Sequence, residues 1–467
     1  MAPTSDRSRG TRAVVANGVG KAVLNLRRLT RGGGSALPGL VAERIDPRMV
    51  SRLVAQLPEG VIVVTGTNGK TTTTKMIVAV LEAQGKTVLT NRSGSNLSRG
   101  VASAILERSA WRGRLLEDIA VFEVDEASMP AVCEQLRPST VVVNNLFRDQ
   151  LDRYGELDTT AAVIGRAIAG LDGSATVCLN ADDPLVASLA RYGDRPDIRW
   201  FGVDAEGVER LDHDAASDSD HCPQCGHALD YTKAYYSHLG HYRCPDGHVE
   251  RPTPELSLTS FESIDVHDGA SRLTVDVEGD SISIVLPLPG LYNAYNALAA
   301  MCAMRSRGVA LHDATDALSH VTAPFGRVEH VDVHGRGLRI ILVKNPAGFN
   351  QIIQTFLGHP KGTRLMLAIN DGLADGRDLS WLWDVAIEDI APCEFVLCTG
   401  GRAADMALRF KYAGAEADVV PDMVEGIAEL LRRTPEGEEA EVLANYTAML
   451  ELRALLDSQA TLKRFWQ

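Results

Sequence analysis

The segment at residues 61–74, VIVVTGTNGKTTTT, contains residue types suited to binding phosphate. Backbone N–H groups in a glycine turn can converge on an anion, and the N-terminus of a following helix adds positive potential. Lys70 can reach the β- and γ-phosphates of a nucleotide, and the Thr71 hydroxyl can ligate Mg²⁺. The general phosphate-binding loop has glycine where Val64 stands, so the match is to the shorter pattern TGTNGKT, and an ordinary glycine turn capping a helix is the alternative. The candidate nucleotide-binding residues here are Thr67, Asn68, Gly69, Lys70, Thr71 and Thr72.

Carboxylates that could hold the metal ion follow the apolar run at residues 119–122. A phosphate-binding loop needs a second, acidic arm to hold Mg²⁺. Glu123 is the first candidate for this arm and Glu126 is the second. The alternative is that both are surface carboxylates at the end of a strand.

Further polar residues are placed where they could surround a nucleotide, because ligands of α/β sheets bind at the carboxyl ends of the strands. These are Asn180, Asp182 and Asp183 after the run at 177–179, and Asn293 and Asn296 near the start of a helix predicted from residue 290. Arg327, beside a glycine turn, is a candidate clamp for a phosphate or acyl-phosphate group. An ordinary surface arginine is the alternative.

Three of the eight cysteines have the spacing of a zinc ribbon. The fourth cysteine of such a ribbon would fall at Gly247, and it is absent. The candidate ligands are Cys222, Cys225, Cys244 and His248, with His241 and His227 as alternatives to the last. We interpret residues 220–250 as an inserted structural module, since four protein ligands close a zinc site to substrate. A degenerate ribbon held by packing alone is the alternative.

The segment at 370–384, NDGLADGRDLSWLWD, places four aspartates and two tryptophans directly after a predicted strand. A solvated loop has no need of Trp381 and Trp383, and tryptophan is favoured at interface hot spots. The segment therefore indicates a docking surface. The alternative is that the tryptophans cover the core of their own domain.

The elements that must position these residues alternate between strand and helix, which predicts an α/β fold with a doubly wound, mainly parallel sheet. We expect a basic lead-in at residues 1–40, a central domain at 41–330 and a second α/β domain at 331–467. The lead-in contains a possible amphipathic helix at 13–29 with Lys21 on its polar side; it is either solvated or in contact with an anionic membrane or a phosphate-bearing substrate.

Bulk composition limits the function. The net charge of −14 argues against general nucleic-acid binding. No apolar run is long enough to span a bilayer, and no signal-type apolar core follows the basic N-terminus, so a cytoplasmic protein is expected. Eight cysteines in 467 residues do not indicate a disulfide scaffold.

Several motifs together resemble the Mur ligase superfamily: TGTNGKTTT, EVDE, NNLFRDQLDRYGE, NADDP, GLYNAYN and FGRVE. Those enzymes activate a carboxylate with ATP as an acyl phosphate, which an amine then attacks. The ribbon with YSHLGHYRCP, the NPAGFNQ segment and NDGLADGRDLSWLWD are similar, more narrowly, to the MurT family, the synthetase subunits of lipid II isoglutaminyl synthase. This resemblance covers about residues 30 to 465.

The resemblance implies a P-loop central domain with a parallel sheet, a zinc-ribbon-like insertion and a Rossmann-like C-terminal domain. It implies ATP and Mg²⁺ as cofactors, a structural zinc ion, lipid II at the inner face of the membrane as substrate, and a GatD-like glutaminase as partner. It adds Asn345 to the residues around the nucleotide. It also implies that an aspartate at 375–384 completes the catalytic triad of the glutaminase, with Asp375 and Asp378 as candidates and Asp384 left open.

Departures from the superfamily pattern bear on the nucleophile. Amino-acid-adding Mur ligases usually carry a DHLD segment, which reads DQLD at 149–152 here, and a carbamylated lysine, whereas no lysine lies between Lys86 and Lys233. Ammonia is therefore the expected nucleophile. Cys398 does not lie in the G-x-C-x-G turn of a glutaminase, so a partner must release the ammonia. The alternatives are a Mur- or folylpolyglutamate-type ligase that adds an amino acid, and a nucleotide-binding scaffold without turnover.

Overall fold

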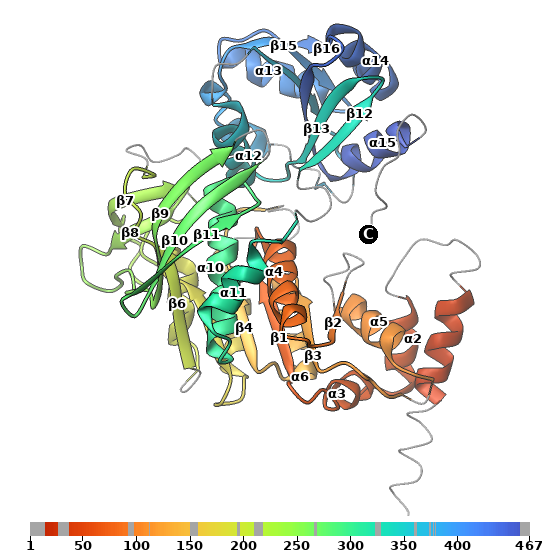
Figure 1. The fold of residues 1–467 in the computed structure, drawn as a ribbon, viewed down its shortest axis with the longest axis vertical. Helices are drawn as coiled ribbons and strands as arrows, with labels where there is room; N and C mark the ends of the chain where they lie inside the picture. Colours follow the sequence, from red (N-terminus) through yellow and green to blue (C-terminus); the bar gives the residue numbers. More distant parts are fainter. Residues whose placement is uncertain are drawn as a thin grey trace, which may run out of the picture.

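The computed structural model describes residues 15–26, 37–91, 98–111, 113–149, 157–193, 197–209, 218–265, 269–322, 328–358, 362–372, 375–376, 378 and 380–457. Two sheets dominate the described part of the chain, one above the other in Figure 1. None of the helices in these ranges is both long and apolar enough to cross a membrane.

The larger sheet has nine strands in the order β11-β10-β9-β6-β5-β4-β1-β3-β2. The bounds are β1 (Val61–Thr65), β2 (Val88–Thr90), β3 (Ile119–Glu123), β4 (Thr140–Val143), β5 (Thr176–Asn180), β6 (Asp197–Val203), β9 (Leu256–Asp265), β10 (Ala270–Val277) and β11 (Asp280–Leu286). Every pairing from β2 to β9 is parallel, and only β9-β10 and β10-β11 are antiparallel. The predicted doubly wound, mainly parallel sheet is confirmed.

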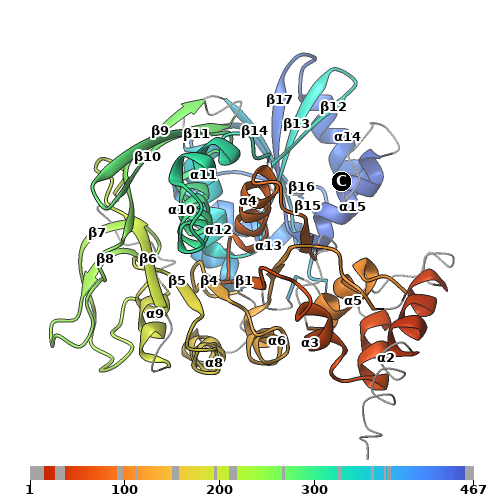
Figure 2. The same ribbon diagram turned by 60° about the horizontal axis from the view of Figure 1, so that its bottom comes forward.

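Helices cover both faces of this sheet, which is why its central strands are continuous apolar runs. Ile62 and Val64 face the core under α4 and α10, whereas Val61 and Val63 face the core under α3, α5, α6 and α8. Figure 2 shows α4, α10 and α11 on one side of the strands and α3, α6 and α8 on the other. The bounds are α2 (Leu37–Ile45), α3 (Met49–Val54), α4 (Lys70–Ala83), α5 (Ser98–Arg108), η1 (Glu126–Ser128), α6 (Met129–Leu136), α8 (Leu157–Ala169), α9 (Pro184–Ser188), η2 (Leu189–Arg191), α10 (Leu291–Ser306) and α11 (Leu311–Leu318).

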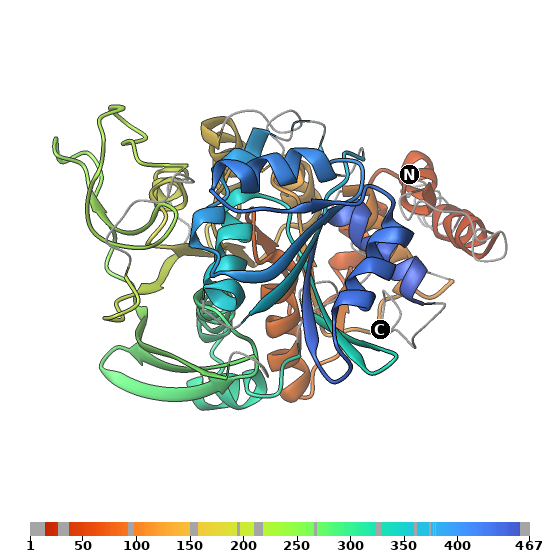
Figure 3. The same cartoon turned by 90° about the horizontal axis from the view of Figure 1, so that it is seen from above.

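A two-stranded antiparallel hairpin, β7 (Asp230–Tyr236) and β8 (Leu239–Arg243), is inserted between β6 and β9. Its aromatic residues join the core of the large sheet: the ring of Tyr236 lies 5.6 Å from Phe147 and 5.7 Å from Tyr295. The hairpin therefore docks close to the segment that follows β4. Figure 3 shows the yellow-green segment that contains it at one edge of the molecule, opposite the red N-terminal helix.

The C-terminal sheet has six strands in the order β12-β13-β17-β14-β15-β16, all parallel except β12. Its two apolar faces are covered by α12 and α13 on one side and by α14 and α15 on the other. The strands are β12 (Glu329–Val333), β13 (Arg336–Leu342), β14 (Thr363–Ala368), β15 (Cys393–Thr399), β16 (Asp418–Val419) and β17 (Glu439–Ala444). The helices are α12 (Pro346–Ile352), the π-helical turn η3 (Ile353–Leu357), η4 (Ser380–Asp384), η5 (Ile387–Asp389), α13 (Ala403–Tyr412), α14 (Met423–Arg433) and α15 (Tyr446–Leu456). The predicted second α/β unit is present, and the predicted domain limits stay predictions.

Candidate nucleotide site and cysteine cluster

The turn between β1 and α4 requires its glycines. Gly66 and Gly69 have φ angles of 124° and 86°, a backbone conformation that residues with a side chain rarely adopt. A Cβ on Gly69 would lie 1.9 Å from Oδ1 of Asn296, and a Cβ on Gly66 would lie 2.9 Å from the carbonyl oxygen of Asn145. The turn is therefore closely packed against the polar residues around it.

Side chains and backbone that follow β4 hold the turn in place. Asn145 accepts a hydrogen bond from the backbone N–H of Asn68 at 2.8 Å and donates one to its carbonyl oxygen at 3.2 Å. The Thr67 hydroxyl exchanges hydrogen bonds with the backbone of Phe147 at 2.9 and 3.1 Å. Two consecutive residues of the turn are thus fixed to the segment that follows β4.

Lys70 and Glu126 form an ion pair inside the site. The Nζ atom of Lys70 lies 2.9 Å from Oε1 of Glu126 and donates to the carbonyl oxygen of Gly66 at 2.6 Å, and the two side chains are only 11% and 9% exposed. Burial lowers the pKa of Lys70, but the charge and hydrogen bond of Glu126 outweigh it and leave the pKa raised. Lys70 is therefore held protonated at the turn, as a phosphate ligand must be.

The acidic arm lies on the strand next to the turn, because β3 pairs with β1. Glu123 is the last residue of β3, and its backbone is fixed by two hydrogen bonds to the Asn91 amide. Thr71, at the start of α4, is exposed. A hydroxyl and two carboxylates are the oxygen ligands that suit Mg²⁺, so Thr71, Glu123 and Glu126 fit the ion by their chemistry.

A hydrogen-bond network of asparagine side chains and Thr73 connects α4 to α10. The Thr73 hydroxyl accepts from Asn144 at 3.0 Å and donates to Asn296 at 3.3 Å, and Asn296 donates to Asn293 at 3.3 Å. The structure thus brings the predicted Asn293 and Asn296 to the helix that begins at Lys70. Both are buried, at 5% exposed each.

Asp182 and Asp183 follow β5, and their carboxylate oxygens accept hydrogen bonds from other residues of the protein. Asp182 is fully buried and accepts hydrogen bonds from the Arg251 guanidinium at 2.7 Å, the Tyr295 hydroxyl at 2.7 Å and a backbone N–H at 2.8 Å. Asp183 caps α9 and accepts the backbone N–H of Leu146 at 2.8 Å. In this conformation both carboxylates support the framework, and their contact with a nucleotide stays a prediction.

Asn180 has a similar supporting position. Its side-chain amide donates to the carbonyl oxygen of Asn144 at 3.0 Å, and its own oxygen accepts the backbone N–H of Asp182 at 3.0 Å. It therefore links the ends of β4 and β5 beneath the glycine turn. Arg327, the predicted clamp, lies outside the described residues.

The C-terminal sheet contributes two residues directly to the turn. Asn345 exchanges side-chain hydrogen bonds with Asn68 at 3.1 and 3.4 Å, and its Oδ1 also caps α12 by accepting the N–H of Gly348 at 2.8 Å. Lys344 donates to Asp149 at 2.6 Å and to the carbonyl oxygen of Thr67 at 3.3 Å. Asn345 was expected here, but Lys344 was missed; its only signal is its position beside Asn345 after a strand.

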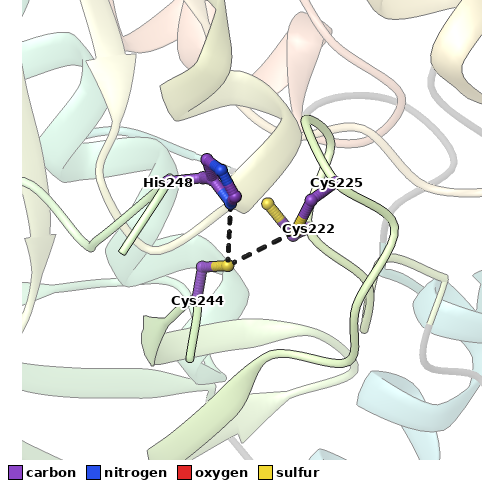
Figure 4. A group of neighbouring side chains, drawn as sticks. All are labelled: Cys222, Cys225, Cys244 and His248. Atoms are coloured by element: carbon purple, nitrogen blue, oxygen red, sulfur yellow. Dashed lines mark hydrogen bonds between the residues drawn. The ribbon is translucent and has the colours of Figure 1, made fainter. Parts of the chain in front are cut away.

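The cysteine cluster has the dimensions of a zinc site (Figure 4). The sulfur atoms of Cys225 and Cys244 are 3.6 Å apart, and Nδ1 of His248 lies 3.7 Å from the Cys244 sulfur. Two sulfurs bound tetrahedrally to zinc at about 2.3 Å lie roughly 3.8 Å apart. The ligand atoms of Cys222, Cys225, Cys244 and His248 all lie within 4.8 Å of one another, so the four residues can hold a metal ion.

The thiols of the cluster differ in pKa: the backbone N–H of His227 lowers the pKa of Cys225, but burial and the neighbouring Cys222 and Cys244 thiols outweigh it and raise the pKa to about 11. Burial raises the pKa of the Cys244 thiol, but hydrogen bonds from the backbone and side chain of His248 outweigh burial and bring the pKa to about 6. The thiolate is the form that binds metal. Of the alternative histidines, His241 contacts Asp204 at 3.1 Å, outside this group of four. His227 pairs with Asp246, and these two residues form with Cys225 a second group whose ligand atoms lie within 4.8 Å of one another.

The two candidate aspartates of the 370–384 segment differ in exposure. Asp375 is 7% exposed and accepts hydrogen bonds from the backbone N–H and the hydroxyl of Thr447, near the start of α15. Asp378 is exposed and accepts the N–H of Ser380 at 2.9 Å. That hydrogen bond lowers the pKa of Asp378, so the carboxylate stays ionised.

One tryptophan of the 370–384 segment covers the core of its own domain, and the other is exposed as a docking residue would be. Trp381 packs against the core of the C-terminal sheet, whereas Trp383 is 48% exposed and its ring contacts Tyr412 edge-on at 5.3 Å. Tyr412 is 73% exposed and Leu408, one turn earlier on α13, is 45% exposed. These three residues form the exposed aromatic surface of the C-terminal sheet.

Comparison with known proteins gives consistent results across the chain. Residues 64–224 match the Mur ligase middle domain, and residues 342–449 match the MurT ligase C-terminal domain. The chain is 35% identical, over 93% of its length and 94% of the relative's, to lipid II isoglutaminyl synthase (glutamine-hydrolyzing) subunit MurT of Streptococcus pneumoniae.

Two solved structures share the fold. A pseudomurein peptide ligase type C from Methanothermus fervidus has a TM-score of 0.67 and 20% identity, covering 86% of this chain and 79% of its own. MurF ligase from Thermotoga maritima in complex with ADP has a TM-score of 0.62 and 16% identity, covering 89% and 83%.

Proposed function

Because the chain belongs to the MurT family of Mur-type ligases of peptidoglycan synthesis, we propose that it amidates the second-position D-glutamate of the lipid II stem peptide. In this reaction ATP phosphorylates the α-carboxylate, ammonia attacks the acyl phosphate, and the products are D-isoglutamine, ADP and phosphate. The observation that carries the proposal is the 35% identity to a MurT subunit over 93% of the chain. The arrangement around the glycine turn supplies the chemistry.

ATP is the expected nucleotide, as the ADP bound to a MurF ligase of the same fold supports. Lys70 and the backbone N–H groups at the start of α4 would bind the β- and γ-phosphates, since the N–H groups of Thr67 and Asn68 already donate to Asn145. When bound, Mg²⁺ would neutralise phosphate charge and stabilise the transferred group, held by Thr71, Glu123 and Glu126. For this, Glu126 must exchange its present partner Lys70 for the metal, while Lys70 exchanges Glu126 for phosphate.

Phosphoryl transfer converts the carboxylate oxygen into part of a good leaving group, and cations at the site stabilise the charge that develops. Arg327 is proposed as a further cation at this step. Lys344 is well placed to support the turn during the reaction, because it donates to the carbonyl oxygen of Thr67 from the C-terminal sheet. Its partner Asp149 begins the altered DQLD segment.

Ammonia as nucleophile is supported by the absence of a lysine between Lys86 and Lys233. Neutral ammonia is scarce near pH 7, so a glutaminase partner of the GatD type is proposed as its source. We propose that Asp378, rather than Asp375, serves the partner's triad, because Asp378 is exposed and ionised whereas Asp375 is bound to Thr447. The exposed aromatic surface of the C-terminal sheet is the proposed docking area.

The cysteine cluster is proposed to hold zinc as a structural ion, since four protein ligands leave no open position. The protein is proposed to act in the cytoplasm at the inner face of the membrane, where a lipid-linked substrate is accessible.

The test uses the purified chain with lipid II, Mg·ATP and either ammonium chloride or glutamine, with products followed by mass spectrometry. Amidation with ammonium but not with glutamine is expected, and adding the glutaminase should allow glutamine to serve. Asp378→Ala should then abolish only the glutamine-dependent reaction, whereas Lys70→Ala should abolish both. An absence of amidation from ammonium, with ATP still bound, would refute the proposal; release of ADP that depends on an added amino acid would indicate an amino-acid-adding ligase.

A further inference from the structure

The N-terminal helix at residues 15–26 is firmly packed on one side. A Cβ on Gly20 would lie 2.5 Å from the Leu106 side chain and 2.9 Å from that of Ala42, so the helix backbone lies against α5 and α2. Asn17 is 1% exposed and donates to the carbonyl oxygens of Ala110 at 2.7 Å and Trp111 at 3.0 Å. These contacts fix which face of the helix points outward.

The outward face of the same helix is also apolar. Val15, Val19, Ala22 and Leu26 recur at intervals of four, three and four residues, which places them in one stripe along an α-helix. All four are exposed, with Val15 at 48%, Val19 at 38% and Leu26 at 62%. We call these four residues the apolar stripe. A helix whose other face is already packed has no need of such a stripe for its own folding.

Other exposed apolar residues come from neighbouring segments. Of the fifteen large hydrophobic residues that are exposed in the described part of the chain, six come from residues 15–116: three in the stripe together with Leu37, Trp111 and Leu116. Figure 1 shows the red N-terminal helix at the edge of the molecule, away from the C-terminal sheet, and Figure 3 shows it at the edge opposite the yellow-green insertion. The stripe is therefore accessible to a large flat partner.

The charge of this region is opposite to that of the rest of the protein. Residues 1–120 contain 18 Lys and Arg against 8 Asp and Glu, of which 10 and 7 lie in the described ranges, whereas the whole chain contains 47 against 61. Arg44 and Arg48 are exposed around α2 and α3, and Arg52, also exposed, pairs with Asp46 at 2.5 Å. An acidic protein with one basic region is oriented by electrostatics toward an anionic surface, with that region leading.

We propose that the apolar stripe binds the surface of an anionic lipid bilayer, with the stripe at the boundary between headgroups and acyl chains and the basic residues against the headgroups. The inference rests on the proposed function, since a lipid-linked substrate would lie at such a surface. The charge decides this occupant over a second copy of the chain, because two basic regions repel each other.

The test is co-sedimentation of the full chain with vesicles of phosphatidylglycerol and phosphatidylcholine, and with phosphatidylcholine alone. The variant V15S/V19S/L26S removes the stripe, and V285S/V424S/L450S removes three similarly exposed apolar residues elsewhere. Wild type and the control variant should bind anionic vesicles in a salt-sensitive manner. The affinity of the stripe variant for these vesicles should be lower by roughly tenfold or more. Circular dichroism checks that both variants fold.

Vesicle binding needs no turnover, so it can succeed or fail independently of the proposed amidation. If amidation is observed, the stripe variant should lose activity on lipid II in vesicles but keep it on a short-chain, water-soluble analogue. Equal vesicle binding by wild type and stripe variant, or binding by neither, would overturn the proposal. So would light scattering showing that the stripe variant dissociates an oligomer while vesicle binding is unchanged.

Discussion

The hydrogen bonds between Asn68 and Asn345 directly link the glycine turn to the segment that follows β13 of the C-terminal sheet, and their contribution to nucleotide binding can be measured. The two residues are 277 positions apart, and their amides exchange hydrogen bonds at 3.1 and 3.4 Å. If the nucleotide binds between the two sheets when they are held as seen here, removing this pair must weaken its binding.

The perturbation must leave the cap of α12 intact, because Asn345 also performs that role. Asn345→Ser retains an oxygen that can accept the N–H of Gly348, but its side chain is too short to reach Asn68. Asn68→Ala removes the same pair from the other side. Asn345→Ala removes the cap as well, so its free energy of unfolding should be about 1 kcal/mol lower than that of Asn345→Ser. It serves as the contrast.

The expected magnitude follows from two neutral hydrogen bonds, one of them long. Each contributes roughly 0.5–1.5 kcal/mol net, so the pair should contribute about 1–2 kcal/mol, or roughly a 5- to 30-fold change in the dissociation constant. Because both single variants remove the same interaction, Asn68→Ala/Asn345→Ser should bind about as weakly as either one.

The assay is titration calorimetry of wild type, both single variants and the double variant with a non-hydrolysable ATP analogue and Mg²⁺. The expected coupling energy is about 1–2 kcal/mol. Effects that add to within about 0.5 kcal/mol would refute the reasoning, since the two side chains would then act independently. Unchanged binding in both single variants would show that the nucleotide does not require this link.

Three further outcomes follow from single sites. Gly69→Ala should abolish nucleotide binding in calorimetry, since its Cβ would lie 1.9 Å from Asn296 and its φ of 86° alone costs roughly 1–2 kcal/mol; binding near the wild-type level would contradict the packing described. His248→Ala should lower zinc content measured by plasma mass spectrometry, whereas His227→Ala should retain it; the reverse would reassign the fourth ligand. Asp182→Asn should lower the thermal unfolding midpoint, since breaking a buried pair costs about 3 kcal/mol or more, and an unchanged midpoint would contradict that role.

Sequence-based prediction was successful where the structure is local. The β-branched run, the two glycines and Lys70 specify strand, turn and helix between residues 61 and 83, so β1 and α4 were predicted, while their contact with a nucleotide stays a prediction. The alternation of such units predicted the parallel sheets of both regions. The metal-like cysteine spacing was also local, and the structure brings those cysteines together with His248.

The strand β17 was missed although it lies in the middle of the C-terminal sheet, between β13 and β14. Its sequence EAEVLA contains two glutamates, which do not indicate a buried strand. Glu441 is 7% exposed because it pairs with Arg339 on β13 at 2.8 and 3.0 Å. The negative charge of Glu441 makes the segment look exposed in the sequence, because the arginine that pairs with it lies 102 positions away in the chain.

By itself the sequence predicted the strand, glycine turn and helix of β1 and α4, the α/β architecture and the cysteine cluster, because each of these patterns is carried by residues close together in the chain. Phosphate binding by the turn stays a prediction. Only the tertiary structure decided which polar residues support the site and which face it. Asp182 follows a strand as a ligand residue would, yet it is enclosed by Arg251 and Tyr295. Lys344 gave little local signal, yet it reaches the turn. A carboxylate or ammonium acts according to the charges around it, and those charges come from segments that only folding brings together.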